Sequence, residues 1–137
     1  MKKGLLILLA AALFGTGAVY AAGPNEDVFK GKLFPPNIIL ENQAELNLSK
    51  DQFTAIKRAV VEVQSNVAEH EWDVREAYMS IMQALDEVPI NEDRVLEFVG
   101  TALLAENEVK KEQMMMLIKL RNLLSAEQIA YLESVRK

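Results

Sequence analysis

The single histidine, His70, is the side chain of this sequence best suited to acid–base or metal chemistry. A protein metal site usually needs three or four ligands. Asp73, three residues later, is the nearby carboxylate that shares a helical face with His70. The pair leaves further ligands to be found elsewhere, so it indicates a metal site only weakly. The chain also has no cysteine, which excludes a thiolate metal site, a disulfide and a cysteine nucleophile.

Methionine and tryptophan side chains form a second group with functional chemistry. Its members are Trp72, Met79 and Met82 on one segment and Met114, Met115 and Met116 on another. Flexible thioethers suit surfaces that bind varied partners, yet a helix that is apolar all round usually lies in a core. Consecutive methionines point in different directions and cannot converge on a copper(I) ion. Both clusters therefore predict either a subunit interface or a binding surface for other proteins.

A heptad seam predicts the first helix that must carry these side chains. Its residues recur at alternating spacings of three and four, and they are Phe53, Ile56, Val60, Val63, Val67, His70, Val74, Ala77, Ile81 and Ala84. Relative to this seam, Trp72 and Met79 fall at position f and Met82 falls at position b. These positions are normally exposed, so the three side chains predict a second contact surface.

A second, looser stripe predicts the partner helix, and it consists of Val95, Val99, Ala102, Glu106, Val109, Gln113, Met116, Leu120 and Leu123. Between the stripes, Pro89 and a capping Asn91 indicate a tight turn. We therefore expect an all-α fold, with helices over residues 50–86 and 92–123 in a long antiparallel hairpin flanked by short helices. A two-helix hairpin has no third layer to cover its remaining apolar surface, so a homodimer is expected.

The position of His70 inside the seam predicts its partner. In a hairpin that turns near residues 88 and 89, opposed residue numbers sum to about 177, which places His70 against Glu106 or Asn107. A buried imidazole needs a hydrogen-bond partner, and a carboxylate is the strongest one available. We therefore expect a structural polar pair between His70 and Glu106 that fixes the register of the hairpin.

Two copies of a capping box mark the ends of the hairpin. In each copy a Ser caps the helix, a Gln three residues later reaches back to the Ser backbone, and the preceding Leu forms a hydrophobic staple. The copies consist of Leu48, Ser49 and Gln52, and of Leu124, Ser125 and Gln128. One copy is a common helix start, whereas two copies with the same spacing are a more specific pattern.

The amino-terminal residues 1–21 are expected to be a cleavable signal peptide. Two lysines precede ten consecutive apolar residues, and Ala21 is the small residue before the cleavage site. Such a run is too short to span a bilayer, which needs about 20 residues, so an uncleaved anchor is the less favoured alternative. No stable membrane insertion is expected after cleavage. Residues 22–36, with their Gly and Pro, are expected to form an extended flexible arm, and residues 37–137 the helical-hairpin domain.

These features together resemble a known family. Paired Leu-Thr/Ser-x-x-Gln motifs around a long hairpin, behind a signal peptide and a Phe34-Pro35-Pro36 segment, are similar to those of the Spy/CpxP periplasmic family and its heavy-metal-resistance sensor branch. The resemblance covers roughly residues 33–137. The chain differs in two respects, because it has Ser where Thr is more usual, and it is acidic where the best-known chaperone members carry a basic concave face.

The resemblance implies a periplasmic, interlocked homodimer that is not an enzyme and needs no cofactor. It implies an ATP-independent chaperone or envelope-stress adaptor, whose partners are unfolded client proteins or an envelope-stress sensor. Nucleic acid is excluded as a partner because the net charge of -5 has the wrong sign. The alternative function is a periplasmic heavy-metal sensor or resistance protein that binds divalent metal, for which His70 and Asp73 are the weak candidates.

Overall fold

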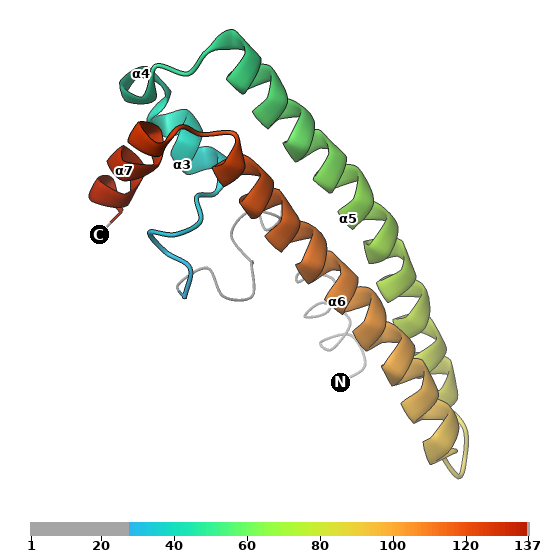
Figure 1. Ribbon diagram of the computed structural model, residues 1–137. Coiled ribbons are helices and arrows are strands. Elements are labelled where there is room, and N and C mark those ends of the chain that lie inside the picture. The colour runs from blue at the N-terminus through green and yellow to red at the C-terminus, as the bar shows by residue number, and fades with distance from the viewer. Residues whose placement is uncertain (1–27, 137) are drawn as a thin grey trace. The chain divides into compact units, whose positions relative to one another are not determined.

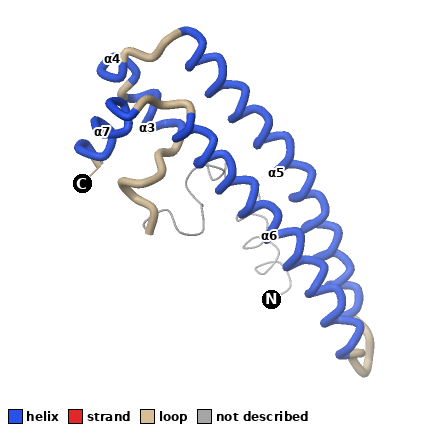
Figure 2. The backbone as a smooth tube through the Cα atoms, viewed as in Figure 1, coloured by secondary structure: helices blue, strands red, loops and turns tan. Residues whose placement is uncertain are grey.

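A computed structural model describes residues 28–136 as helices joined by loops, with no β-strand among them (Figure 2). The helices are α3 (Pro36–Glu41), α4 (Gln43–Leu46), α5 (Lys50–Leu85), α6 (Glu92–Asn122) and α7 (Ala126–Val135) (Figure 1). The all-α helical hairpin expected from the sequence is therefore confirmed. The signal peptide expected over residues 1–21 lies outside the described residues. Within residues 28–136, no helix has both the length and the apolar character to cross a bilayer.

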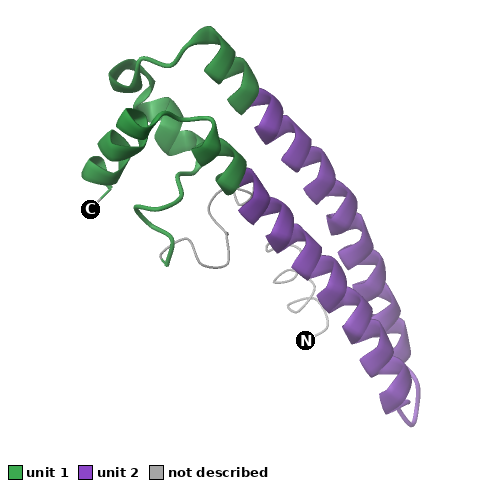
Figure 3. Cartoon of the chain, viewed as in Figure 1, with its two compact units in different colours: residues 1–56, 117–137 green, residues 57–116 purple. Residues whose placement is uncertain are grey.

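The described chain divides into two compact units (Figure 3). Unit 1 contains residues 28–56 and 117–136, and unit 2 contains residues 57–116. Both long helices contribute to both units: unit 1 includes the start of α5 and the end of α6, and unit 2 contains the remainder of each.

Unit 1 buries large apolar side chains that come from distant parts of the sequence. Phe34, Ile39, Leu120 and Leu132 are all completely buried, and they come from the segment before α3, from α3, from α6 and from α7. Pro36 begins α3, where its fixed φ angle suits a helix and its missing N–H would have had no partner. Pro36 therefore starts the short helix α3 at the point where the chain enters the core of unit 1.

The flexible arm predicted over residues 22–36 is wrong for its last residues. Phe34 and the two prolines that follow it are buried. The carbonyl of Lys32 accepts a hydrogen bond from Arg121 at 3.0 Å, and the Arg121 guanidinium lies 5.9 Å from the centre of the Phe34 ring. The Gly and Pro content indicated an extended segment, but it could not show that Phe34 anchors this segment in a core. Residues 22–27 lie outside the described residues.

Unit 2 consists of α5 and α6 running antiparallel on either side of the turn at residues 86–91 (Figure 1). Ala77, Ile81 and Ala102 form a buried cluster, against which the partly buried Tyr78 and Phe98 pack. The two alanines of this cluster have short side chains, so they fill only a thin layer between the two helices.

As the sequence predicts, α6 begins directly after the turn at residues 86–91. The Oδ1 atom of Asn91 accepts a hydrogen bond from the backbone N–H of Arg94 at 3.1 Å, which is the bond of an N-cap. Both helix ends at this turn lie within one residue of their expected positions.

The heptad seam of α5 faces the interior with few exceptions. Its buried members are Ile56, Val63, Val67, Val74, Ala77, Ile81 and Ala84. Val60 and His70 are half-buried, whereas Phe53 is 44% exposed. Phe53 lies in the first turn of α5, and its opposed position near residue 124 falls beyond the end of α6 at Asn122. The seam therefore extends past the part of α6 that could cover it.

Candidate functional site

Both capping boxes form, at the starts of α5 and α7. The backbone N–H of Gln52 donates to Ser49 Oγ at 3.0 Å, and the Ser49 N–H donates to Gln52 Oε1 at 3.1 Å. The Gln128 N–H donates to Ser125 Oγ at 3.2 Å, and the Ser125 N–H donates to Gln128 Oε1 at 2.8 Å. The two motifs therefore cap these helices in the way that their spacing predicts.

The hydrophobic staples differ between the two motifs. Leu124 is buried and Ile129, five residues later, is half-buried. Leu48 is half-buried, and its counterpart Phe53 is exposed. Apolar burial therefore supports the start of α7 more than the start of α5.

The two boxes also bind each other, although 76 residues separate their glutamines. Gln52 Nε2 donates to Gln128 Oε1 at 2.7 Å and to the carbonyl of Leu123 at 2.9 Å. Gln128 Nε2 donates to Gln52 Oε1 at 3.1 Å and to the carbonyl of Leu46 at 3.0 Å. Each amide thus accepts through its oxygen from its own Ser and from the other Gln. We call this reciprocal pair, Gln52 and Gln128, the glutamine clasp.

The glutamine clasp explains what Gln provides at the third position of both boxes that Glu would not. A Glu carboxylate can complete a capping box, but it has no N–H to donate to a facing side chain or carbonyl. Two carboxylates at this distance would also repel each other. The clasp therefore ties the start of α5 to the start of α7. Because amides do not ionise at neutral pH, the two glutamines cannot act as an acid or a base, and we assign the clasp a structural role.

Sequence reasoning treated the two boxes as separate helix starts and missed the clasp. A usable signal was present, because each Gln oxygen is used by its own cap while the NH₂ group still needs acceptors. Two matched motifs at one end of a hairpin can satisfy that need for each other.

The predicted pair between His70 and Glu106 is wrong. Glu106 accepts a hydrogen bond from Tyr78 Oη at 2.7 Å. His70 Nδ1 lies 3.9 Å from Asp73 Oδ2 on its own helix, and His70 and Glu108 line the same flank of the hairpin. Because each residue turns an α-helix by about 100°, Glu106 points to the other side of α6 from Glu108. The rule that opposed residue numbers sum to about 177 predicted the position along the hairpin correctly. It did not predict which side of α6 faces His70.

Hydrogen bonds between side chains cross unit 2 from α5 to α6, and two of them bear on the register of the hairpin. One is the bond from Tyr78 to Glu106, and the other runs from Asn66 Nδ2 to Glu112 Oε2 at 3.0 Å. The hydrogen bond to Glu106 raises the pKa of Tyr78 above its usual 10.0, and burial and the negative charge of Glu106 act in the same direction. These bonds fix the register of the hairpin, which is the role predicted for His70.

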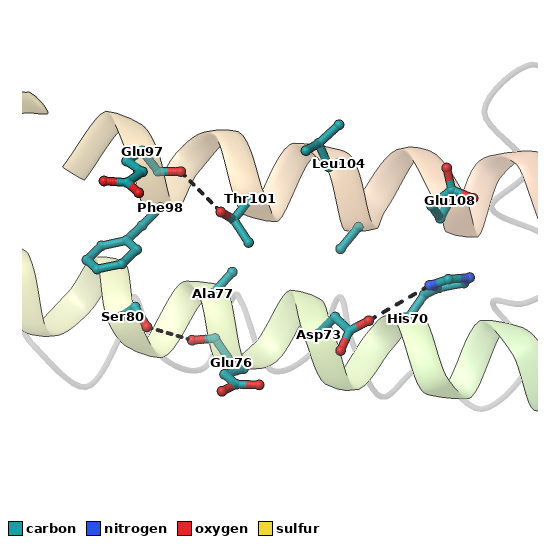
Figure 4. Close-up of a pocket in the computed structure, with 11 residues that line it drawn as sticks. His70, Asp73, Glu76, Ala77, Ser80, Glu97, Phe98, Thr101, Leu104 and Glu108 are labelled. Atoms are coloured by element: carbon teal, nitrogen blue, oxygen red, sulfur yellow. Dashed lines mark hydrogen bonds and ion pairs between the residues drawn. The ribbon is translucent and has the colours of Figure 1, made fainter. Parts of the chain in front are cut away.

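A shallow groove of about 620 Å³ runs along one flank of unit 2 (Figure 4). The residues that line it are His70, Asp73, Glu76, Ala77, Ser80, Glu97, Phe98, Thr101, Leu104, Ala105 and Glu108. The buried Ala77 and Ala105 hollow it, since their side chains are short. Ser80 and Thr101 each donate to a backbone carbonyl four residues earlier, at 3.2 Å. The groove is acidic, because four of its lining residues are carboxylates and none is Lys or Arg.

Metal-ligating side chains do not form a cluster in the described part of the chain. Within residues 28–136, no three His, Asp or Glu side chains gather in a way that could hold a metal ion. His70 and Asp73, the weak candidates from the sequence, are a pair without a third ligand in that range.

The outward-facing aromatic and methionine residues of α5 are exposed, as their heptad positions predict. Trp72 and Met79 are 66% and 59% exposed, and Met82 is exposed as well. The Arg75 guanidinium covers part of Trp72, lying 4.6 Å from the centre of its ring. The three methionines of α6 separate, since Met116 is buried, Met114 half-buried and Met115 exposed. Met116 therefore belongs to the core, and the role of the others as a contact surface stays a prediction.

Sequence reasoning missed three exposed leucines of α6, namely Leu96, Leu103 and Leu104. Their signal was their absence from the inward stripe of α6, which leaves them on the solvent side. We call these leucines, together with Trp72, Met79 and Met82, the outer apolar residues.

No family model, no curated protein and no solved structure matches this chain. The function is therefore inferred from the contacts of the described residues and from the sequence pattern.

Proposed function

We propose that this protein is a periplasmic, ATP-independent chaperone or envelope-stress adaptor that works as a homodimer and binds unfolded or partner proteins. The observation that supports the proposal is the set of outer apolar residues. Leu104, for example, is 70% exposed, which is more than either Trp72 or Met79. Large apolar side chains that gather into an exposed patch mark surfaces that contact another protein.

The chemistry of the outer apolar residues suits partners of varied sequence. Methionine is flexible and polarisable, so it adapts to side chains of different shape. Leucine and tryptophan add apolar area, which favours binding by about 25 cal/mol per Å² removed from water. A surface of this kind holds exposed apolar segments through burial alone and needs no nucleotide.

The homodimer in the proposal follows from the thin core of unit 2. Small residues such as Ala77 and Ala102 fill the space between α5 and α6, and they leave the outer side of each helix uncovered. We assign Trp72 and Met79 on α5 to contact with a second copy of the chain. The leucines of α6 then remain available to client proteins.

The proposal has three further parts that come from the sequence. The amino-terminal segment directs export, the protein catalyses no reaction, and it needs no cofactor. The net charge of -5 disfavours nucleic acid as a partner.

The proposal is tested by mixing purified mature protein with an unrelated unfolded protein and following aggregation by light scattering. We expect suppression at near-stoichiometric ratios without ATP. Leu103→Ala/Leu104→Ala should weaken suppression while leaving the dimer intact in sedimentation. Trp72→Ala/Met79→Ala should instead weaken the dimer, so that it dissociates to monomer at a higher protein concentration than the wild type does.

Leu40→Ala is the matched control, because Leu40 is an exposed leucine of unit 1 outside the proposed surface. It should change neither suppression nor sedimentation. Absence of suppression at every ratio would refute the chaperone proposal. Absence of suppression combined with micromolar binding of Zn, Cu, Ni or Co salts would favour the heavy-metal alternative.

A further inference from the structure

The negative charge of the chain is concentrated in the loop end of the hairpin. Residues 70–104, which we call the acidic segment, contain eight carboxylates and two arginines, for a net charge of -6. The net charge of the whole chain is -5, so the remaining residues together carry +1. In the mature chain, which lacks Lys2 and Lys3, the net charge is -7, and the acidic segment carries -6 of it.

Both arginines of the acidic segment already have partners. Arg94 Nη1 lies 2.6 Å from Glu87 Oε1, and its guanidinium is 5.8 Å from the centre of the Phe98 ring. Arg75 lies over Trp72. Among the described residues, no cation pairs with the exposed Glu76 or Glu97, which both line the groove of unit 2. Their negative charges are therefore available to a cation from outside the chain.

Exposed apolar side chains gather in the same segment. Nine of the sixteen exposed large apolar residues of the described chain lie there, although the segment is only about a third of that length. Val88 at the turn is 96% exposed, and Leu85 and Ile90 beside it are exposed as well. In the groove, Phe98 and Leu104 stand among the carboxylates (Figure 4). Negative charge and exposed apolar side chains therefore occur in the same segment, and both line the groove.

We infer that the acidic segment is a docking surface for a basic amphipathic segment of another protein, one that carries Lys or Arg next to large apolar residues. The inference rests on the proposed function and names its partner class. Lys and Arg complement Glu76 and Glu97, while apolar side chains cover Phe98 and Leu104 in the groove. The groove extends from His70 to Ser80 on α5, about 15 Å at the rise of an α-helix, and this matches about ten residues of a docked helix.

Charge excludes the other occupants of such a surface. Anionic lipid headgroups and nucleic acid carry the same sign of charge as the acidic segment. A second copy of this chain is assigned to Trp72 and Met79, which do not line the groove, and once Lys2 and Lys3 leave with the signal peptide the residues outside its acidic segment carry a net charge of -1. A purely cationic small molecule would leave the exposed leucines and Val88 uncovered.

The test uses purified full-length mature protein and three fluorescent peptides with blocked ends. One peptide places Leu and Lys in an amphipathic heptad pattern, the second replaces every Lys by Glu, and the third replaces every Leu by Ser. We expect the Leu/Lys peptide to bind more than about tenfold tighter than either counterpart. Its affinity should fall as salt rises from about 0.01 M to 1 M, where the Debye length shrinks from about 30 Å to 3 Å.

Glu76→Gln/Glu97→Gln should weaken the Leu/Lys peptide by about two- to twentyfold, as expected for loss of two exposed ion pairs. Glu41→Gln/Glu45→Gln is the matched control, because it removes two exposed carboxylates from α3 and α4 of unit 1. This control should leave the affinity unchanged. Equal affinity for the Leu/Lys and Leu/Glu peptides, or equal weakening by both double variants, would overturn the inference.

Aggregation assays with an acidic and a basic unfolded protein separate the two proposals. Suppression that is indifferent to client charge, together with no peptide preference, would refute the docking surface and leave the chaperone proposal standing. Binding of the Leu/Lys peptide without suppression of either client would refute the chaperone proposal and leave the docking surface standing.

Discussion

Unit 1 and unit 2 achieve their stability in opposite ways (Figure 3). Unit 1 completely buries large side chains such as Phe34, Leu120 and Leu132, and it pairs the polar groups of its two helix starts through the glutamine clasp. Unit 2 has a core rich in Ala and Val, and it leaves larger residues such as Trp72 and Leu104 in water. Large apolar side chains are therefore exposed more often in unit 2 than in unit 1.

This difference predicts which of the two units contacts other proteins. Five large apolar residues are exposed in unit 1, against eleven in unit 2. The exposed side chains of unit 2 gain from contact with a further surface, so partners are expected there. Substitutions in unit 1 should therefore change stability, whereas substitutions on the outside of unit 2 should change binding.

The largest expected effect is a core truncation in unit 1. Leu120→Ala should lower the free energy of unfolding by about 2–5 kcal/mol, because it removes a fully buried side chain and leaves a cavity. The matched change in unit 2, Leu104→Ala, should alter it by less than about 0.5 kcal/mol. Urea unfolding followed by circular dichroism measures both. Similar values for the two variants would show that the outer leucine is covered in solution and that the contrast between the units is false.

The fold was largely predictable because its signals are periodic. The heptad seam and the turn at residues 86–91 determined the hairpin, since an apolar stripe must face another stripe and a Pro between them ends the first helix. The packing of Phe34 was not predictable in the same way. A single aromatic residue between Gly and Pro carries no period, so only its burial in the folded chain shows that it is part of the core.

The glutamine clasp should show the next largest effect. Gln52→Ala and Gln128→Ala should each cost about 1–3 kcal/mol, because each removes several hydrogen bonds that contribute about 1 kcal/mol apiece. The double variant should cost less than the sum, because either single change already breaks the two bonds between the amides. Gln83→Ala, an exposed position of α5, is the control and should be nearly neutral. Strict additivity in the double-mutant cycle would mean that the two amides do not interact in solution.

The candidate site was only partly predictable, for a reason of geometry. Local motifs such as the capping boxes depend on residues three apart, so their spacing in the sequence determines them. The clasp and the Tyr78–Glu106 bond depend instead on how distant segments face each other. An error of one or two residues rotates a helical side chain to the other flank. His70 shares its flank with Glu108, two residues beyond the predicted Glu106.

The helix caps should give a smaller effect than the clasp. Ser49→Ala and Ser125→Ala should each lower the free energy of unfolding by about 0.5–2 kcal/mol, the usual cost of losing an N-cap hydroxyl. Ser→Thr at either position keeps the hydroxyl and should cost distinctly less. Ser65→Ala, in the exposed interior of α5, should not destabilise the protein, because Ala is the better helix former. If the two cap variants unfold at the wild-type midpoint, the hydroxyl bonds at these helix starts contribute nothing.

The smallest expected effect is the bond between Tyr78 and Glu106 in unit 2, and pH reveals it. Tyr78→Phe should cost about 0.5–1.5 kcal/mol at neutral pH, the net value of one hydrogen bond. The pKa of Tyr78 is raised above the usual 10.0 in the folded chain, so folding favours the protonated phenol. The contribution is therefore fully present below pH 10 and is lost as pH rises through the folded pKa.

The difference in unfolding free energy between wild type and Tyr78→Phe, measured from pH 7 to 11, follows this contribution directly. Ionisation of lysines and other shared groups cancels in that difference, so a decline above pH 10 reports on Tyr78 alone. Glu106→Gln keeps an oxygen that accepts the bond but removes its charge, so in this background the decline should still begin near pH 10 but be smaller and end at lower pH. A difference that stays constant across the range would show that the phenol does not donate to Glu106. The register of unit 2 would then depend on apolar packing and Asn66–Glu112, which would widen the contrast with the polar clasp of unit 1.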